Sequence, residues 1–288
     1  LEFSEKLSKI GTHPIIGTQI NLKVNNIIGK ITLYAKTEEG YKNLTKLSSL
    51  SYLNCKEIED PNCEIKDIIA NHKDLILLTG SYRDFFGKIF QANKLKDFEN
   101  IVISLKEHFK DRIYFEIQRH NENDEVNFEN YLLKSSKLFN IPIIATQEVF
   151  YLDQHMYEAH DALTCIGEKN FIEDNNRFKF SNEHYLKKHD DLFDLYSDIP
   201  EALENNFNFH LRFSFKPKKS KPILPSIANN RQNLPEDELL VQAKEGLLNR
   251  INNFVLKKNS SQKKEEIIKI YEDRLNHEIN IINSMDYA

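Results

Sequence analysis

The chain has 288 residues, of which 40% are hydrophobic and 29% charged, as in an ordinary globular protein. Its formal net charge of −5 argues against a surface that follows nucleic-acid phosphates along its whole length, because such binding needs clustered cations. Three cysteines without a Cys-x-x-Cys pair argue against a disulfide framework or zinc cluster, and no apolar run reaches the roughly 20 residues that cross a bilayer. We therefore expect a cytoplasmic protein with no membrane partner.

The first half of the chain alternates apolar runs with amphipathic stretches. The runs are rich in β-branched residues and predict buried strands at Ile15–Leu22, Ile31–Ala35, Leu75–Thr79, Ile113–Ile117 and Ile141–Thr146. Apolar residues at three- and four-residue spacing predict helices between them, at Glu38–Leu53, Phe86–Phe109 and Phe128–Phe139. This alternation predicts an α/β fold with a parallel sheet, either open or closed into a barrel.

The second half of the chain shows helical patterns without strands. Helices are predicted at Met156–Glu168, Glu183–Tyr196, Glu201–Leu211, Glu236–Leu256 and Gln262–Met285. A basic stretch, Arg212–Lys221, and the prolines up to Pro225 interrupt them. We therefore expect a domain of residues 1–212 and a second segment of residues 213–288. The first residue is Leu1 and the last helix ends without a cap, so we expect an internal fragment.

Working groups of a parallel β/α barrel lie where strands end at their carboxyl side. This rule selects Gln19, Glu116–His120 and Ala145–Phe150. An imidazole just past a strand end, such as that of His120, is placed to bind a metal, although a solvent-facing loop histidine is the alternative. Glu148 is either a hard oxygen ligand or a solvated surface residue.

Other polar clusters have simpler explanations. His155 and His160 are five residues apart, so they lie on different faces of a helix and we expect capping or packing roles. The carboxylates at positions 190, 191, 194 and 198 are interpreted as the solvated face of a helix. Arg212–Lys221 is either a phosphate-binding segment or a charged linker. The chain contains no Walker loop, GxGxxG or Gly-x-Ser-x-Gly motif, and no Asp-x-Asp at a strand end.

Read together, segments along nearly the whole chain resemble the bacterial polymerase III α subunits, the replicative C-family polymerases, in their family order. These segments are Pro14–Asn21, Gly40–Leu47, Leu75–Gly80, Phe115–His120, Ile141–Thr146, Tyr157–Ile166, Asp198–Asn205, Leu239–Leu247 and Tyr271–Ile279. The resemblance implies a distorted, TIM-like β/α barrel of the polymerase and histidinol phosphatase (PHP) type without its N-terminal part, over residues 1–212. Residues 213–288 would be a linker and the helical beginning of the palm domain. It places the family's His-x-His motif before this chain, and its catalytic aspartates and Mg²⁺ site after it.

The resemblance also marks departures from relatives that bind metal in the PHP domain. Gln19 stands where such a relative carries an acidic residue, and Phe150 stands where it carries a histidine. His120 matches a family ligand, and Glu148 is the other residual candidate. One retained ligand cannot hold a catalytic ion that needs at least three protein groups, so the sequence predicts a degenerate metal site.

By resemblance, the chain would be a non-catalytic PHP scaffold and docking region within a DNA-directed DNA polymerase. DNA and dNTPs would be bound by the palm, fingers and thumb beyond this chain. The implied protein partners are a proofreading exonuclease subunit, a sliding clamp and other holoenzyme subunits. The alternatives are a metal-dependent PHP phosphoesterase or 3′–5′ exonuclease, and a purely interacting module.

Overall fold

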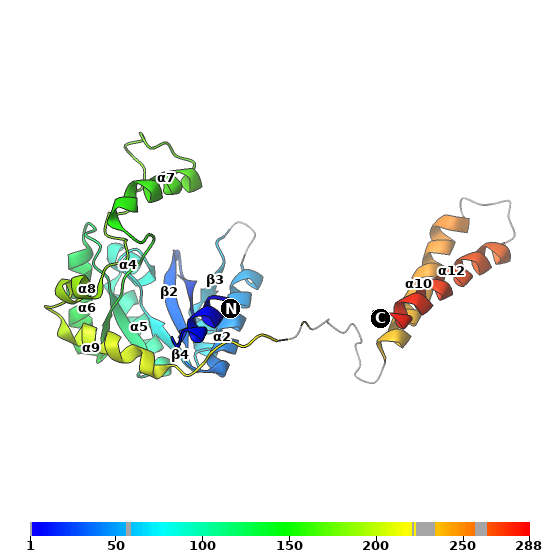
Figure 1. Cartoon of the computed structure of the whole chain (residues 1–288), viewed down its shortest axis with the longest axis horizontal. Helices are drawn as coiled ribbons and strands as arrows, with labels where there is room; N and C mark the ends of the chain where they lie inside the picture. The colour runs from blue at the N-terminus through cyan, green and yellow to red at the C-terminus, as the bar shows by residue number, and fades with distance from the viewer. Residues whose placement is uncertain (1, 56–58, 221, 223–233, 257–263) are drawn as a thin grey trace. The chain divides into compact units, whose positions relative to one another are not determined.

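The computed structural model describes residues 2–55, 59–220, 222, 234–256 and 264–288, and Figure 1 shows their elements. The chain divides into two compact units, residues 1–219 and 220–288. Lys221 and Pro225 of the predicted linker lie outside the described residues. The assignment of residues 213–288 to a palm domain stays a prediction.

The first unit combines short strands with helices. Its strands are β1 (Gly17–Val24), β2 (Ile27–Ala35), β3 (Asn62–Glu64), β4 (Leu75–Leu78), β5 (Ile113–Ile117) and β6 (Ile143–Ala145). Its α-helices are α1 (Glu2–Lys9), α2 (Glu38–Leu53), α3 (Ile65–Ala70), α4 (Phe85–Gln91), α5 (Leu95–Phe109), α6 (Glu125–Phe139), α7 (Tyr157–Glu168), α8 (His189–Leu195) and α9 (Pro200–Phe209).

The described strands form one six-stranded sheet in the order β3-β1-β2-β4-β5-β6. β1 pairs with β3, β4 with β5 and β5 with β6 in parallel, but β2 is antiparallel to both β1 and β4. The prediction of a parallel sheet therefore holds for β4, β5 and β6 and for the β1–β3 pair, but it is wrong for β2. The reason is local: only Asn25 and Asn26 connect β1 to β2, Asn25 has a φ of 54°, and a two-residue turn can join only antiparallel neighbours.

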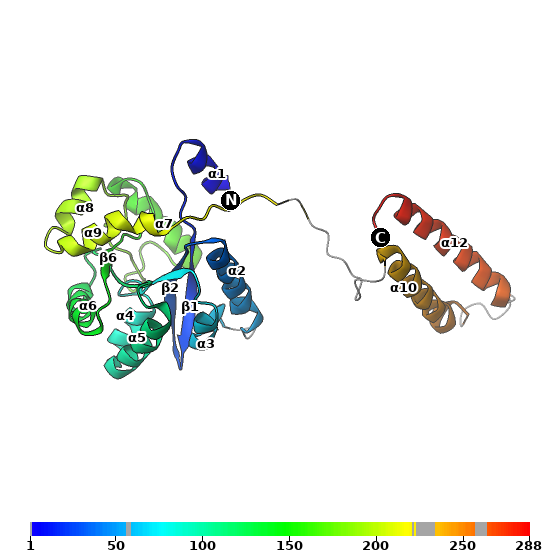
Figure 2. The same ribbon diagram turned by 90° about the horizontal axis from the view of Figure 1, so that it is seen from below.

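The two faces of the sheet bury different clusters. One face carries the main core, in which Leu33, Leu77 and Phe115 pack with residues of α2 to α6, such as Phe86 and Phe98. The opposite face carries a smaller cluster of Ile76, Leu78, Tyr114, Ile144, Phe209 and Phe213. Figures 1 and 2 show helices packed around this sheet, so the distorted β/α architecture is confirmed.

Helix boundaries follow local signals. Glu38–Leu53 is helical as predicted, and the Thr37 side chain caps it by accepting a hydrogen bond from the Gly40 N–H. The single helix predicted over residues 86–109 is wrong, because Asn93 adopts a φ of 54° and separates α4 from α5. The helix predicted from Glu183 begins only at His189.

Residues between Tyr151 and Tyr185 form an arm that includes α7 and leaves the rest of the unit, as Figure 1 shows. A parallel β-bridge between these two tyrosines closes its base. Within the arm, both guanidinium nitrogens of Arg177 bind the Asp161 carboxylate. This bidentate pair ties the loop after α7 back to the helix.

The basic stretch after α9 lies along the first unit as far as the structure describes it there. Phe213 is buried, and Phe215 stacks on Tyr41 with ring centroids 4.9 Å apart. Arg212 donates to the Asp111 carbonyl, and Lys219 pairs with Glu5 at 2.9 Å. Two of the segment's cations, Arg212 and Lys219, are therefore engaged in contacts within the unit.

The second unit contains α10 (Pro235–Arg250), the π-helical turn Ile251–Val255 and α12 (Lys264–Ser284), and the two helices lie side by side in Figures 1 and 2. Ile251, Ile267 and Ile279 are its buried apolar side chains among the described residues.

Candidate functional site

The carboxyl ends of β4, β5 and β6 meet at one edge of the sheet, as the barrel rule predicts. Glu116, near the end of β5, joins the three strand ends, because its carboxylate accepts hydrogen bonds from the Gly80 N–H (3.0 Å), the Gln118 amide (2.9 Å) and the Thr146 hydroxyl. Burial raises the pKa of Glu116 despite these hydrogen bonds. Glu116 therefore fixes the floor of the site.

His120 lies just above this floor and is 3% exposed, so the interpretation as a solvent-facing loop residue is wrong. Its backbone N–H donates to the carboxylate of Glu125. Its Nε2 accepts a hydrogen bond from the Glu148 N–H over 3.3 Å. The structure thus brings His120 and Glu148 together, although the contact uses the backbone of Glu148.

His184 is a member of the site that the sequence did not identify. Its ring is 1% exposed and lies flat against that of His120, with centroids 4.1 Å apart and planes within 2°. Its Nδ1 lies 3.1 Å from the Glu148 carbonyl oxygen, which accepts the proton on that nitrogen. His184 reaches the site through a β-bridge neighbour, so no local sequence spacing relates it to His120.

Phe150 continues the stack of rings outward. Its centroid lies 4.9 Å from that of His184 and 4.8 Å from that of His160, and the planes are inclined by 23° and 8°. His120, His184, Phe150 and His160 therefore form a column, which we call the ring stack. Burial is the main cause that lowers the pKa of His160, and the electrostatic effect of the nearby His184 lowers it further. An imidazole at position 150 would offer lone pairs here, whereas the phenyl ring offers none.

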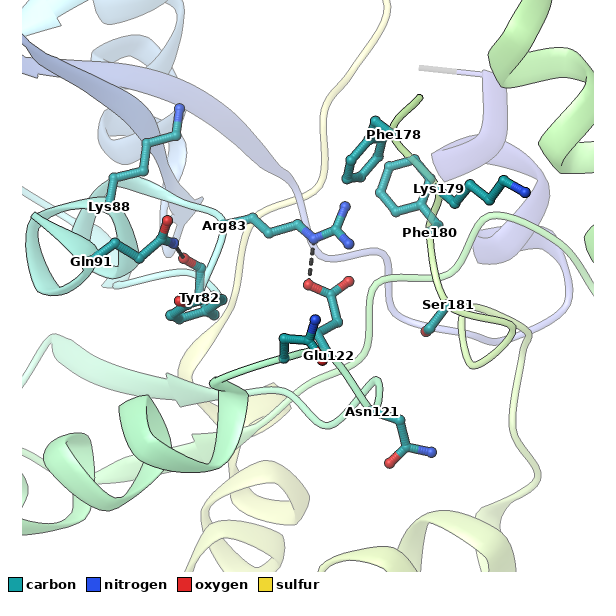
Figure 3. A pocket seen from close by; sticks show the side chains of 11 residues that line it. Tyr82, Arg83, Lys88, Gln91, Asn121, Glu122, Phe178, Lys179, Phe180 and Ser181 are labelled. Atoms are coloured by element: carbon teal, nitrogen blue, oxygen red, sulfur yellow. Dashed lines mark hydrogen bonds and ion pairs between the residues drawn. The ribbon is translucent and has the colours of Figure 1, made fainter. Parts of the chain in front are cut away.

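An arginine and a glutamate border the ring stack. Arg83 donates from Nε to the Glu122 carboxylate, and its guanidinium lies over the rings of Phe178 (4.3 Å) and Phe180 (4.8 Å), as Figure 3 shows. Burial disfavours the charge on Glu122, but the nearby His184 ring and the Arg83 guanidinium outweigh it and hold the Glu122 pKa below its usual value.

Polar atoms near this border are buried without a hydrogen-bond partner among the described residues. They are Nη1 of Arg83, Oε1 of Glu122 and Nε2 of His184, and the last two lie 3.6 Å apart. Each such atom loses hydration that nothing in the described chain replaces, which is a feature typical of functional sites.

The adjoining hollow has a volume of about 620 Å³. It is lined by Tyr82, Arg83, Lys88, Gln91, Asn121, Glu122, Asn123, Phe178, Lys179, Phe180 and Ser181, most of which Figure 3 labels. Cations outnumber carboxylates in this lining, so the hollow favours anionic groups.

The remaining predicted residues lie apart from the ring stack or hold other partners. Gln19 is exposed within β1, and its side chain lines a separate hollow with Asn21 and Tyr52. His155 is exposed in a 3₁₀ turn at the start of the arm. Asp198 is bound by Arg119 and so is more than a solvated surface group. Within the part of the chain that the structure describes, no three His, Cys, Asp or Glu side chains are grouped as a metal site requires.

Comparison with known proteins shows which families the chain is similar to. Residues 1–120 match the family model of the PHP domain. The whole chain is 34% identical to DNA polymerase III subunit alpha of Rickettsia bellii, 32% to that of Caulobacter vibrioides and 28% to that of Vibrio cholerae. The chain spans about a quarter of the length of each of these relatives, 25% in all three cases. The resemblance to the polymerase III α subunits is therefore confirmed. None of the described helices is both long and apolar enough to cross a membrane.

Proposed function

We propose that this chain is part of the catalytic α subunit of a bacterial replicative DNA polymerase, and that it serves there as a PHP scaffold and docking region. The observation that carries the proposal is similarity to such subunits over 100% of the chain. Residues 1–212 would be the PHP domain, and residues 213–288 the linker and the beginning of the palm. Template-directed nucleotidyl transfer, with Mg²⁺, would take place elsewhere in the same polypeptide.

The chemistry of the ring stack supports a degenerate metal site. A catalytic cation needs several lone pairs directed at one point. His120 directs Nε2 at the Glu148 N–H, and Phe150 has no lone pair to offer. Gln19, where the resemblance places an acidic ligand, lines a different hollow. His120 and Glu148 would then be remnants of a ligand set.

The same residues support a structural role for the site. Glu116 joins three strand ends, and the ring stack joins the β5 and β6 loops to the arm. A domain held in this way presents its outer helices as a rigid surface to neighbouring proteins. The proposed partners are DNA and dNTPs, bound by the palm, fingers and thumb of the parent protein, and a proofreading exonuclease, sliding clamp and other holoenzyme subunits. The proposed location is the cytoplasm.

A metal-dependent phosphoesterase or 3′–5′ exonuclease is the second candidate. It is favoured by the gathering of His120, His184, Glu122 and Glu148 beside a hollow with a cationic lining. In that case the buried atoms without partners would be groups that await an ion or a phosphate.

Primer extension by the full-length parent protein tests the first proposal. With Mg²⁺ and dNTPs we expect synthesis that depends on a template and is unchanged in kcat by His120→Ala. Hydrolysis of single-stranded DNA and of p-nitrophenyl phosphate is measured in parallel with added Mn²⁺ or Zn²⁺. Hydrolysis by the wild type that His120→Ala abolishes would support the second candidate instead. Absence of synthesis by an otherwise folded parent would contradict the polymerase assignment.

A further inference from the structure

A second hollow, of about 740 Å³, lies between α8 and α9, away from the ring stack. Leu192 and Phe193 of α8 face Leu203 and Phe207 of α9 across it, and Pro200 also lines it. Phe193 is 56% exposed and Phe207 75% exposed. We call this hollow the α8–α9 groove.

Two helical stripes form the walls of the groove. Positions 200, 203 and 207 follow the three- and four-residue spacing of one helix face, and positions 189, 192 and 193 do so on the other helix. The floor of the groove rests on the core, because the half-buried Leu192 and Leu203 pack against the cluster that buries Tyr196 and Ala202. The exposed rings are thus presented on firmly anchored helices, and a groove between two helices is a shape that accepts an amphipathic helix.

The segment that forms the groove is strongly acidic, and Glu204 lines the groove itself. Residues 188–208 contain six carboxylates, at positions 190, 191, 194, 198, 201 and 204, and one lysine, Lys188. Asp198 is held by Arg119, but Asp190, Asp194, Glu201 and Glu204 are exposed. An apolar floor within an acidic segment selects a partner with the opposite pattern.

This charge decides among possible occupants. Nucleic acids and anionic membranes would be repelled by the carboxylates. A second copy of the chain that docked through the same groove would place like charges against each other. The basic segment of this chain is already anchored elsewhere, since Phe213 is buried against the sheet and Phe215 stacks on Tyr41.

We propose that the α8–α9 groove binds an amphipathic helix of a partner protein, with aliphatic side chains on one face and Lys or Arg residues on both flanks. The apolar face covers Phe193 and Phe207, and the flanking cations meet Asp194, Glu201 and Glu204. This inference goes beyond the polymerase assignment and does not depend on it, because it uses only the shape and charge of the groove.

Two helical peptides of about 18 residues test the proposal. Both carry the same leucine stripe, and their flanks are lysine in one and glutamate in the other. Fluorescence anisotropy measures their binding to the full chain at about 50 mM salt, where surface charges are weakly screened. We expect the lysine peptide to bind about tenfold more tightly than the glutamate peptide, and this preference to shrink as salt is added.

Variants locate the binding site. Phe207→Ser and Glu204→Lys change exposed residues, so both proteins should fold, and we expect each to weaken the lysine peptide about fivefold or more. Leu163→Ser, on α7 and 64% exposed, is the matched control that should leave binding unchanged. Equal binding of both peptides, or equal effects of Phe207→Ser and Leu163→Ser, would overturn the proposal. So would sedimentation data in which Phe207→Ser abolishes self-association, because a second copy would then be the occupant.

Discussion

Removing the side chain of Arg119 should destabilise the first unit more than breaking an exposed ion pair would. Arg119 follows β5 and donates to Glu129 on α6 over 2.6 and 2.9 Å, and to Asp198 over 2.7 and 2.8 Å. It also donates to the Leu195 carbonyl over 2.6 Å, and its guanidinium lies over the Tyr196 ring. One side chain therefore joins β5, α6 and the α8–α9 corner.

The magnitude follows from exposure. Arg119 and Glu129 are 20% and 14% exposed, so Arg119→Ala leaves a partly buried carboxylate without its cation, whereas Asp198, at 62%, is largely screened by solvent. Breaking a fully buried pair costs about 3–5 kcal/mol, and the residual exposure and the weak Asp198 arm bring our expectation to about 3 kcal/mol. Arg119→Lys keeps the positive charge but cannot make the bidentate contact, so we expect the free energy of unfolding to fall by about 1–2 kcal/mol.

Urea unfolding followed by near-ultraviolet circular dichroism measures this loss, because ten of the twelve tyrosines lie within residues 1–219. Arg274→Ala is the control, since it breaks an exposed pair between Arg274 and Glu278 on α12. Arg119 also lowers the pKa of Asp198. The stability that the Arg119–Asp198 pair contributes is therefore present above the usual aspartate pKa of about 3.9 and is lost as pH falls through the lowered value. An Arg119→Ala midpoint equal to that of Arg274→Ala would refute the reasoning.

Three further predictions concern the arm, the floor of the site and the helix packing. Arg83→Ala removes the cation that covers the arm's aromatic rings, so we expect tryptic cleavage after Lys179 to become about fivefold faster, as measured by mass spectrometry. Burial raises the pKa of Glu116, so the stability linked to its proton is present at low pH and is lost as pH rises from the usual glutamate pKa of about 4.3 through the raised value. Glu116→Gln cannot ionise, so its Tm should fall less than that of the wild type as pH rises above about 4.3. Gly87→Ala would place a Cβ in steric conflict with the Tyr82 carbonyl oxygen and should cost about 2–3 kcal/mol in urea unfolding. Gly246→Ala, with open space around it, should be neutral or stabilising.

Local sequence patterns were sufficient to predict secondary structure where each residue's neighbours in sequence decide its conformation. Leu75–Leu78 is apolar on both faces and Ile113–Ile117 is apolar except for Glu116, so they could be predicted as buried strands. Glu38–Leu53 could be predicted because a capping threonine precedes an amphipathic stretch. The turn at Asn25 was missed because asparagine adopts a positive φ without any pattern that shows it, and that turn decides the direction of β2.

The site was predictable only in part, because distant segments build it. His120 was selected by the rule for strand ends, and its burial could not be inferred from its polar sequence neighbours. His184 was missed because it follows an arm of some thirty residues and enters the site through the bridge at Tyr185. A histidine followed by an aromatic residue, as in His184-Tyr185, is the weak sequence signal that could have drawn attention to it.

Metal content of the full-length parent protein, measured by plasma mass spectrometry after dialysis against Zn²⁺ or Mn²⁺ and then buffer, tests most directly whether the ring stack has replaced a metal site. We predict substoichiometric metal that is the same in wild type, His120→Ala and the exposed control His189→Ala, with no phosphoester hydrolysis. One tightly held ion per chain that only His120→Ala removes, together with hydrolytic turnover, would contradict the account.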